Sequence, residues 1–333
     1  MKAAVIGAGA WGTTLAKILA ENGHNVVIWS HDALIAEQIN KQHENIGLFP
    51  GFKLPENITS TVSLEEAAKS ADLVVLVVAS KFYAATVKNI SPFLSEQTVI
   101  VSATKGLDPG TNRRTSEIML ENLPENLRKN SAVLSGPNIA KEIAVQKPAT
   151  TVIASLNPET AKKAQAYFST KYFRVYTNDD IIGAEIGGTL KNIIAIAAGI
   201  VDGLQLGDNA RSSLMVRGMA EIIRFGTHFG AKPDTFFGLA GMGDLITTCS
   251  SVMSRNHYVG ENLAKGRKLS EILAGMTAVA EGVETAKHVR ELAIKENIVM
   301  PVTEQVYQVL FEDKPVQQAI LDLMTRDLKS EKI

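Results

Sequence analysis

The stretch MKAAVIGAGAWG, residues 1–12, runs from an apolar segment directly into Gly7, Gly9 and Gly12. At this spacing Gly7 can take a tight turn, Gly9 lets a phosphate approach the backbone, and Gly12 lets the next helix lie close to the strand. The N–H groups at the start of such a helix favour a negative charge. A helical pattern continues to Gly23, and a second strand, NVVIW, follows. The stretch therefore predicts a unit that binds the pyrophosphate of a dinucleotide.

The composition is typical of a soluble globular protein. The chain has 333 residues, 45% of them hydrophobic, and this length favours about two domains. The formal charge of −1 indicates no basic face of the size that nucleic-acid binding requires, so no nucleic-acid partner is expected. Cys249 is the only cysteine, and no Cys/His cluster has zinc-site spacing, so we predict neither a disulfide nor a metal site.

The apolar segments favour buried elements over membrane spans. The apolar start meets a glycine turn within a few residues and then a helix with Lys17 and Glu21, which is unlike a signal peptide. The longest apolar runs, LVVLVVA and IIAIAAGIV, fall short of the ~20 residues that cross a bilayer. We therefore expect no membrane insertion and a cytoplasmic protein.

Strand-like and helix-like segments are distributed unevenly along the chain. In the first half, helical segments alternate with the apolar runs AAVIG, NVVIW, LVVLVV, TVIVSA, SAVLSG, TTVIAS and FRVYT. This alternation predicts an α/β fold with a Rossmann-type, doubly wound, largely parallel sheet. From about Asp179 the pattern becomes helical. We expect a dinucleotide-binding domain at 1–185 and an all-helical domain at 186–333, with a continuous cleft between them.

Polar residues follow three predicted strands at the ends where ligands of such sheets gather. Ser30-His31 follow NVVIW, where a strictly NAD-selective enzyme more often has an acid, and the missing carboxylate leaves room for the 2′-phosphate of NADP. His31 either assists there or is a surface histidine at the start of the next helix. The turns Thr104-Lys105-Gly106 and Pro137-Asn138 follow two further strands at the same edge. Lys105 is either a solvated charge or a contact to an anionic ligand.

The segment GGTLKN opens an apolar helix and carries a lysine that needs an explanation. It places Lys191 and Asn192 on the first turns of that helix. Lys191 either snorkels from a buried helix end to water or is held in a cleft, where it polarises a substrate oxygen.

A second polar segment, GLAGMGDLITTCSSVMSRNHYVGENLAKG, combines a glycine-rich turn with a helix start. Ser254 can cap a helix whose first turn carries Arg255 and Asn256, a set of donors suited to a phosphate monoester. The alternative is an ordinary cap followed by surface polar residues. Asp244 either orients a catalytic lysine or caps its own turn.

Taken together, these segments resemble bacterial-type NAD(P)-dependent glycerol-3-phosphate dehydrogenase over nearly the whole chain. The resemblance rests on GAGAWGTTLA, SATKGL, SGPNIAKE, GTLKNIIAIAAGIVDGLQLGDNARSSLMVRGMAE, GLAGMGDLITTC, SRNHYVG and AEGVET, all in the family's order. It implies a Rossmann domain followed by a helical substrate-binding domain. It also implies interconversion of dihydroxyacetone phosphate and sn-glycerol 3-phosphate, with NADP or NAD, for phospholipid synthesis.

Carried over by position, the resemblance implies a role for each matching residue, and it makes Lys191 the catalytic one. The residues near the cofactor would be Gly7, Gly9, Trp11, Gly12, Thr13, His31, Lys105, Ala140, Arg255 and Glu281. Those around the substrate would be Lys105, Gly136, Asn138, Lys191, Asp244, Ser254, Arg255 and Asn256. The sequence departs at Asn138, where many relatives have Ser or Thr, and at His31, where some have Arg. Either departure would alter affinity or cofactor preference.

The implied reaction transfers a hydride to the ketone carbon while Lys191 protonates or polarises the oxygen. The reverse oxidation needs burial or a neighbouring cation, such as Lys105, to make the ammonium lose its proton more readily. We expect NADPH to be accepted. Two alternatives stay open: another hydroxy-acid or sugar-acid dehydrogenase of the same architecture, and a non-catalytic NAD(P)H-binding redox sensor. A homodimer formed through the helical half is compatible with the sequence, which does not specify it.

Overall fold

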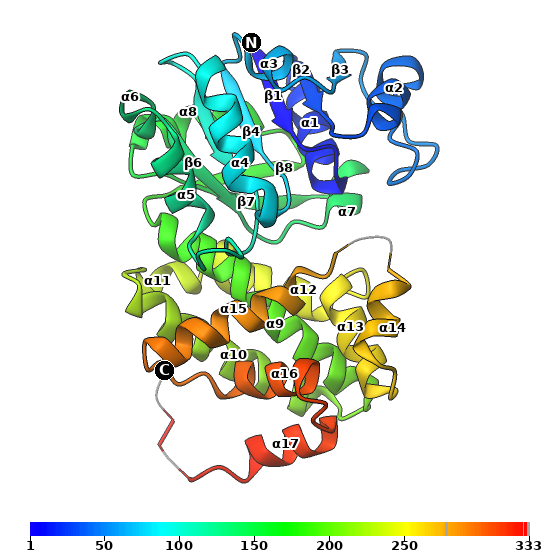
Figure 1. The fold of residues 1–333 in the computed structure, drawn as a ribbon, viewed down its shortest axis with the longest axis vertical. Helices are drawn as coiled ribbons and strands as arrows, with labels where there is room; N and C mark the ends of the chain where they lie inside the picture. Colours follow the sequence, from blue (N-terminus) through cyan, green and yellow to red (C-terminus); the bar gives the residue numbers. More distant parts are fainter. Residues whose placement is uncertain (277–278, 329, 332–333) are drawn as a thin grey trace. The chain divides into compact units, whose positions relative to one another are not determined.

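The chain consists of two compact units, Met1–Ile181 and Ile182–Ile333. The computed structural model describes residues 1–276, 279–328, 330 and 331. The first unit is an α/β fold built on one sheet, and the regular elements described in the second are all helices (Figure 1). The predicted combination of a Rossmann-type sheet and a helical C-terminal part is confirmed.

The first unit, all of whose residues are described, is built on an eight-stranded sheet. The strands are β1 (Lys2–Ile6), β2 (Asn25–Trp29), β3 (Ile58–Thr61), β4 (Leu73–Leu76), β5 (Val99–Ser102), β6 (Ser131–Ser135), β7 (Ala149–Ala154) and β8 (Phe173–Asn178). Their order is β3-β2-β1-β4-β5-β6-β7-β8, and only β6 and β7 pair antiparallel. The order reverses between β1 and β4, so the end of β1 lies at the point where ligands bind on such sheets.

Helices cover both faces of this sheet. They are α1 (Ala10–Glu21), α2 (Ala33–Gln42), α3 (Leu64–Ala68), α4 (Ser80–Ile90), α5 (Thr115–Asn122), α6 (Glu125–Arg128), α7 (Ala140–Ala144) and α8 (Pro158–Phe168). Side chains of β1 alternate between two cores: Val5 belongs to the core that includes Leu15 of α1, and Ile6 to the core that includes Val87 of α4. Burial on both faces explains why the strands are continuous apolar runs in the sequence.

The sequence predicts seven of these strands and misses β3. β3 lies at the edge of the sheet beside β2 and reads ITST, with Ile58 as its only apolar residue. Polar bonds hold it, because the Asn40 amide donates to Ser60 O (2.8 Å) and accepts from Ser60 N (2.7 Å). An edge strand held in this way needs no apolar run, so hydrophobic patterning did not reveal it.

The second unit is arranged around α9 (Ile181–Gly203). The other helices are α10 (Asp208–His228), α11 (Pro233–Phe236), a π-helical turn (Leu239–Gly243), α12 (Asp244–Ser250), α13 (Arg255–Ala264), α14 (Leu269–Ala274), α15 (Glu281–Lys295), α16 (Pro301–Phe311) and α17 (Val316–Met324). By length and composition alone α9 is long enough to cross a membrane, but 94% of its most apolar window is buried. It is the core helix of this unit.

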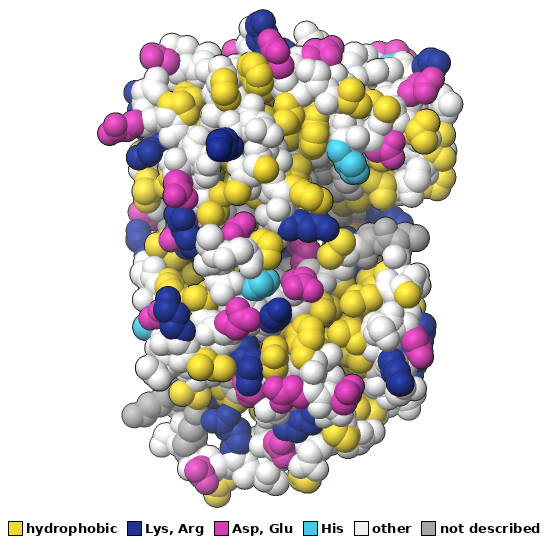
Figure 2. Space-filling model, in the orientation of Figure 1, with side chains coloured by type: hydrophobic (Ala, Val, Ile, Leu, Met, Phe, Trp, Pro, Cys, Tyr) yellow, Lys and Arg dark blue, Asp and Glu magenta, His cyan; other side chains and the backbone are white. Residues whose placement is uncertain are grey.

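Charges of both signs are interspersed on the face of the molecule drawn in Figure 2. In the face drawn in Figure 2, Lys and Arg are interspersed with Asp and Glu and do not form a one-sign field. The formal net charge of −1 leads to the same expectation.

A buried carboxyl ties α10 to α16 in the second unit. Glu221 is 2% exposed and accepts hydrogen bonds from Val302 N (2.5 Å), Thr303 N (3.1 Å) and Thr303 Oγ1 (3.0 Å). Burial raises the pKa of Glu221 to about 7, against these bonds and the nearby Arg224 charge, which lower it. The folded protein therefore holds this proton more tightly than the unfolded chain does.

The raised pKa of Glu221 predicts that the folded protein loses stability as the pH rises. Because the folded pKa lies above the unfolded value, the contribution of Glu221 is fully present below about pH 4.5 and is lost toward about pH 7. Denaturant unfolding at pH 5 and pH 7.5 is expected to show a fall of up to about 3 kcal/mol in wild type that Glu221→Gln lacks. Parallel pH dependences for the two proteins would contradict this assignment.

Candidate functional site

The glycine turn after β1 has the geometry that its spacing predicts. Gly7 has a φ of +129°, and a Cβ added there would lie 2.7 Å from Val77 O. A Cβ on Gly12 would lie 2.0 Å from Gly7 O, so only glycine lets α1 lie this close to the strand. A Cβ on Gly9 would meet nothing within 4 Å. Packing therefore requires glycine at positions 7 and 12, whereas the surface of Gly9 is open to a ligand.

The start of α1 has the features of an anion site. Gly9 is the N-cap, no side chain caps it, and its first turn contains no acidic residue. The first N–H groups of a helix have no partner within the helix, and they attract negative charge.

The two other predicted cofactor residues, Trp11 and Thr13, lie at the start of α1, where protein contacts hold both side chains. Trp11 makes an edge contact with Phe173 at 6.4 Å between ring centroids. Thr13 is buried and accepts from Asn45 Nδ2 (3.0 Å), which also donates to Ala8 O (2.9 Å). Sequence reasoning missed Asn45, because it lies in a loop 32 residues away and no motif marks it.

The segment after β2 differs in detail from its prediction. His31 is exposed and precedes α2, but the helix begins at Ala33, with Asp32 as its N-cap. The carboxylate of Asp32 accepts from Leu34 N (2.8 Å). The first acidic residue after β2 is therefore engaged as a helix cap.

The turns after β5 and β6 lie at one edge, as predicted, because these strands are parallel neighbours. The turn after β5, which carries the half-buried Lys105, is tied to the end of β4 by Thr104 Oγ1, which donates to Val78 O (2.8 Å). After β6, a Cβ on Gly136 would lie 3.0 Å from Thr151 Cα, so this turn presses against β7. Asn138 donates to Thr150 O (3.0 Å) and accepts from Thr151 Oγ1 (2.8 Å).

Asn138 therefore anchors its turn to β7. Ala140, at the start of α7, accepts from Thr14 Oγ1 (3.2 Å) and so joins α7 to α1.

Lys191 lies deeper in its helix than the sequence suggests. Because α9 begins at Ile181, Lys191 is in its third turn, and the expectation that it opens the helix is wrong. Its side chain does not snorkel to water: Lys191 is 7% exposed, and its ammonium forms an ion pair with Asp244. It also donates to Thr248 Oγ1 (2.6 Å). The buried ammonium is thus held by a carboxylate and a hydroxyl.

The glycine-rich turn explains how Asp244 reaches the lysine. A Cβ on Gly187, one turn before Lys191, would lie 2.4 Å from Ala240 O, so the π-helical turn lies against the backbone of α9. Asp244 then begins α12 and is 1% exposed. Of the two roles predicted for Asp244, the structure shows contact with the lysine. π-Helical turns are rare and often occur at functional sites.

Thr248 is a further residue bonded to Lys191, and sequence reasoning missed it. It lies one turn after Asp244 on α12, and its hydroxyl donates to Asp244 O (2.7 Å) while accepting from Lys191. The i, i+4 spacing with Asp244 is the signal that would have found it. The adjacent Cys249 is buried, and burial raises the pKa of its thiol to about 12, so it remains protonated.

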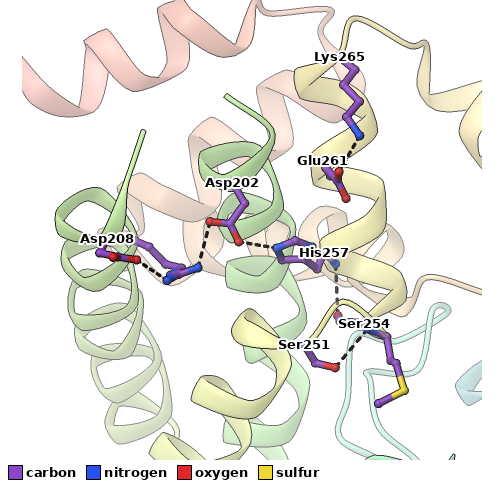
Figure 3. Close-up of polar contacts among 9 residues, drawn as sticks. Asp202, Asp208, Ser251, Ser254, His257, Glu261 and Lys265 are labelled. Atoms are coloured by element: carbon purple, nitrogen blue, oxygen red, sulfur yellow. Dashed lines mark hydrogen bonds and ion pairs between the residues drawn. The ribbon is translucent and has the colours of Figure 1, made fainter. Parts of the chain in front are cut away.

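The start of α13 is confirmed as a capped helix. Ser254 is the N-cap, and its Oγ accepts from His257 N (3.2 Å) (Figure 3). Arg255 is exposed, whereas Asn256 is buried at 7% exposure. The alternative interpretation, in which the cap is followed only by surface residues, is therefore wrong for Asn256.

Asn256 joins three helices of the second unit. Its Nδ2 donates to Asn192 Oδ1 (2.9 Å) on α9, and its Oδ1 accepts from Gly282 N (2.9 Å) on α15. Glu281 begins α15 next to that contact. The start of α13 is therefore fixed beside the residue that follows Lys191.

Comparison with known proteins shows the family to which the chain is related. Two family profiles match: the NAD-dependent glycerol-3-phosphate dehydrogenase N-terminus over residues 2–161, and its C-terminus over residues 180–321. A protein named glycerol-3-phosphate dehydrogenase [NAD(P)+] from Bacillus thuringiensis is 48% identical over 99% of this chain and 97% of its own.

Solved structures agree. A glycerol-3-phosphate dehydrogenase from Coxiella burnetii is 36% identical with a TM-score of 0.91, covering 98% of this chain and 99% of that one. One from Saccharomyces cerevisiae is 30% identical with a TM-score of 0.85, at 98% and 99% coverage. With matches over both units and nearly the whole length, the chain belongs to the NAD-dependent glycerol-3-phosphate dehydrogenase family.

Proposed function

We propose that this protein reduces dihydroxyacetone phosphate to sn-glycerol 3-phosphate with NAD(P)H, a step that supplies phospholipid synthesis. In the overall reaction the ketone, NAD(P)H and one proton give the alcohol and NAD(P)⁺. The observation that carries the proposal is the buried Lys191 ammonium, which is held by Asp244 and Thr248. The next residue of α9, Asn192, accepts a hydrogen bond from Asn256 at the capped start of α13.

The first unit fits the dinucleotide. The open surface at Gly9 and the uncapped start of α1 suit a pyrophosphate, which gains from the N–H groups and the helix dipole there. When bound, the coenzyme supplies the hydride. We assign Gly7, Gly9, Trp11, Gly12, Thr13, His31 and Ala140 to this site, together with Lys105, Arg255 and Glu281. The capping role of Asp32 leaves no free carboxylate directly after β2, which supports acceptance of NADPH.

Lys191 supplies the main electrostatic stabilisation. As the ketone oxygen becomes an alkoxide, a preorganised ammonium stabilises the charge and delivers a proton. Asp244 compensates the ammonium while it is buried, and Thr248 restricts its position by accepting one of its hydrogens. In the reverse oxidation the same nitrogen takes the hydroxyl proton.

The start of α13 is assigned to the phosphate. Its backbone N–H groups attract an anion, and the Arg255 guanidinium can hold two phosphate oxygens in one plane. Binding energy from this distant group helps to hold the carbonyl in position. Lys105, Gly136, Asn138, Asp244, Ser254 and Asn256 complete the proposed substrate residues. We further propose that the protein works in the cytoplasm as a homodimer and without a metal ion.

A spectrophotometric assay tests this function. NADPH absorbance is expected to fall on adding dihydroxyacetone phosphate, and to fall far more slowly with unphosphorylated dihydroxyacetone, because that compound lacks the phosphate. NADH is measured in parallel. Equal rates for the two ketones would favour a different hydroxy-acid or sugar-acid dehydrogenase. NADPH binding without oxidation would favour the redox sensor.

A further inference from the structure

We infer that His257, held by Asp202, is a positioning residue that sets the affinity for the substrate phosphate. The inference rests on the proposed function of the α13 start. The ring of His257 bonds to Asp202, which is not assigned to the chemistry. It acts by fixing the first turn of α13, which carries Arg255 and Asn256.

The ring of His257 connects this first turn to the end of α9. His257 Nε2 lies 2.8 Å from Asp202 Oδ2, and the His257 side chain is 8% exposed (Figure 3). Because an ionised carboxylate only accepts, Nε2 must carry the hydrogen. The N–H of the same residue donates to the cap, Ser254. One residue thus links the cap of α13 to α9.

Asp202 is itself held in place. Its other oxygen, Oδ1, lies 3.4 Å from Arg211 Nη1, and Arg211 Nη2 lies 2.5 Å from Asp208 Oδ1 (Figure 3). The carboxylate therefore uses one oxygen for α13 and the other for α10. Such an arrangement restricts the direction in which it accepts from His257.

Backbone packing makes the position of α13 sensitive to this contact. A Cβ on Gly199 would lie 2.0 Å from His257 O, and one on Gly260 would lie 1.9 Å from Ile196 O. The two helices therefore touch through their backbones around His257.

α9 carries both Lys191 and Asp202, which are eleven residues apart and so about three turns along nearly the same face. The hydrogen bond between His257 and Asp202 therefore fixes the position of the proposed phosphate site, at the start of α13, relative to the Lys191 ammonium. Displaced donors make longer and less well aligned hydrogen bonds to the phosphate, which weakens its binding.

The test compares His257→Leu, which removes the hydrogen bond, with His257→Gln, whose amide N–H can replace it. His257→Leu is expected to raise KM for dihydroxyacetone phosphate about tenfold while kcat stays within about twofold, since one bond is lost and the ammonium is unchanged. The inhibition constant of inorganic phosphate should rise by the same factor. His257→Gln should recover most of the affinity.

Three further variants make the result decisive. Glu261→Gln removes the ion pair with Lys265, the C-cap residue of α13 (2.6 Å), and is expected to leave every constant unchanged. Asp202→Ala, which removes the acceptor, should raise KM, and the double variant with His257→Leu should be no worse than the worse single one. If His257→Leu does not fold, Asp202→Ala, which removes the same hydrogen bond from the other side, still decides the question.

The outcomes separate this inference from the function on which it rests. If Arg255→Ala raises KM and His257→Leu leaves it unchanged, the phosphate site stands and the positioning role is wrong. If Arg255→Ala also leaves KM unchanged, the phosphate site itself is wrong. A fall in kcat at constant KM, or a lower melting temperature with normal kinetics, would also overturn the inference.

Discussion

Replacing Lys191 with methionine is expected to lower kcat by about 10²–10³-fold while NADPH still binds. The ammonium is the group proposed to stabilise the developing alkoxide, and removing one preorganised donor of this kind costs about 10²–10³-fold. NADPH binding is measured by fluorescence titration and turnover by the absorbance assay. Near-normal turnover would refute the assigned role.

A second variant separates this loss from misfolding. Lys191→Met leaves the carboxylate of Asp244, which is 1% exposed, without its ion-pair partner, and breaking a buried pair costs about 3–5 kcal/mol of stability. Lys191→Met with Asp244→Asn removes both charges, so the melting temperature should recover toward that of wild type. Activity should not recover with it. If activity followed stability, Lys191 would be a structural residue.

The second large effect is expected at the glycine turn, where two similar substitutions should fail in different ways. Gly12→Ala brings a Cβ to 2.0 Å from Gly7 O, so the first unit should lose at least about 1–3 kcal/mol of stability or fail to fold. Gly9→Ala meets no protein atom within 4 Å, and Gly9 has a φ of −70°, which alanine adopts. Its stability should stay within about 0.5 kcal/mol of wild type.

Cofactor binding then distinguishes the two positions. Gly9→Ala should weaken NADPH binding at least about tenfold, because its methyl group occupies the space proposed for the pyrophosphate. Thermal unfolding and fluorescence titration of both variants provide the measurements. Normal NADPH affinity in a stable Gly9→Ala protein would place the cofactor elsewhere. A fully stable Gly12→Ala would contradict the packing.

Much of the first unit could be predicted because its signals are local. A strand buried on both faces must be apolar along its length, so β1, β4 and β5 are visible as runs, and the glycine spacing follows from sterics within one turn. Ser254 was also predictable, since a cap bonds to an N–H only three residues away. The hydrophobic pattern did not predict β3, because an edge strand held by hydrogen bonds from Asn40 can be polar.

In the helical unit, the start of α9 could not be predicted from the sequence. The segment before Lys191 contains Gly183, Gly187 and Gly188, which have low helix propensity, so the true start of α9 was missed. Gly187 is tolerated there because it lets Ala240 approach the helix.

By itself, the sequence determined the alternation of strands and helices, the glycine turn and the cap of α13. Each of these depends on residues within a few positions of one another. Only the tertiary structure decided what surrounds Lys191, since Asp244 and Thr248 are 53 and 57 residues away along the chain. A buried charge must find its partner in space, and periodicity carries no information about which distant carboxylate the fold will bring to it.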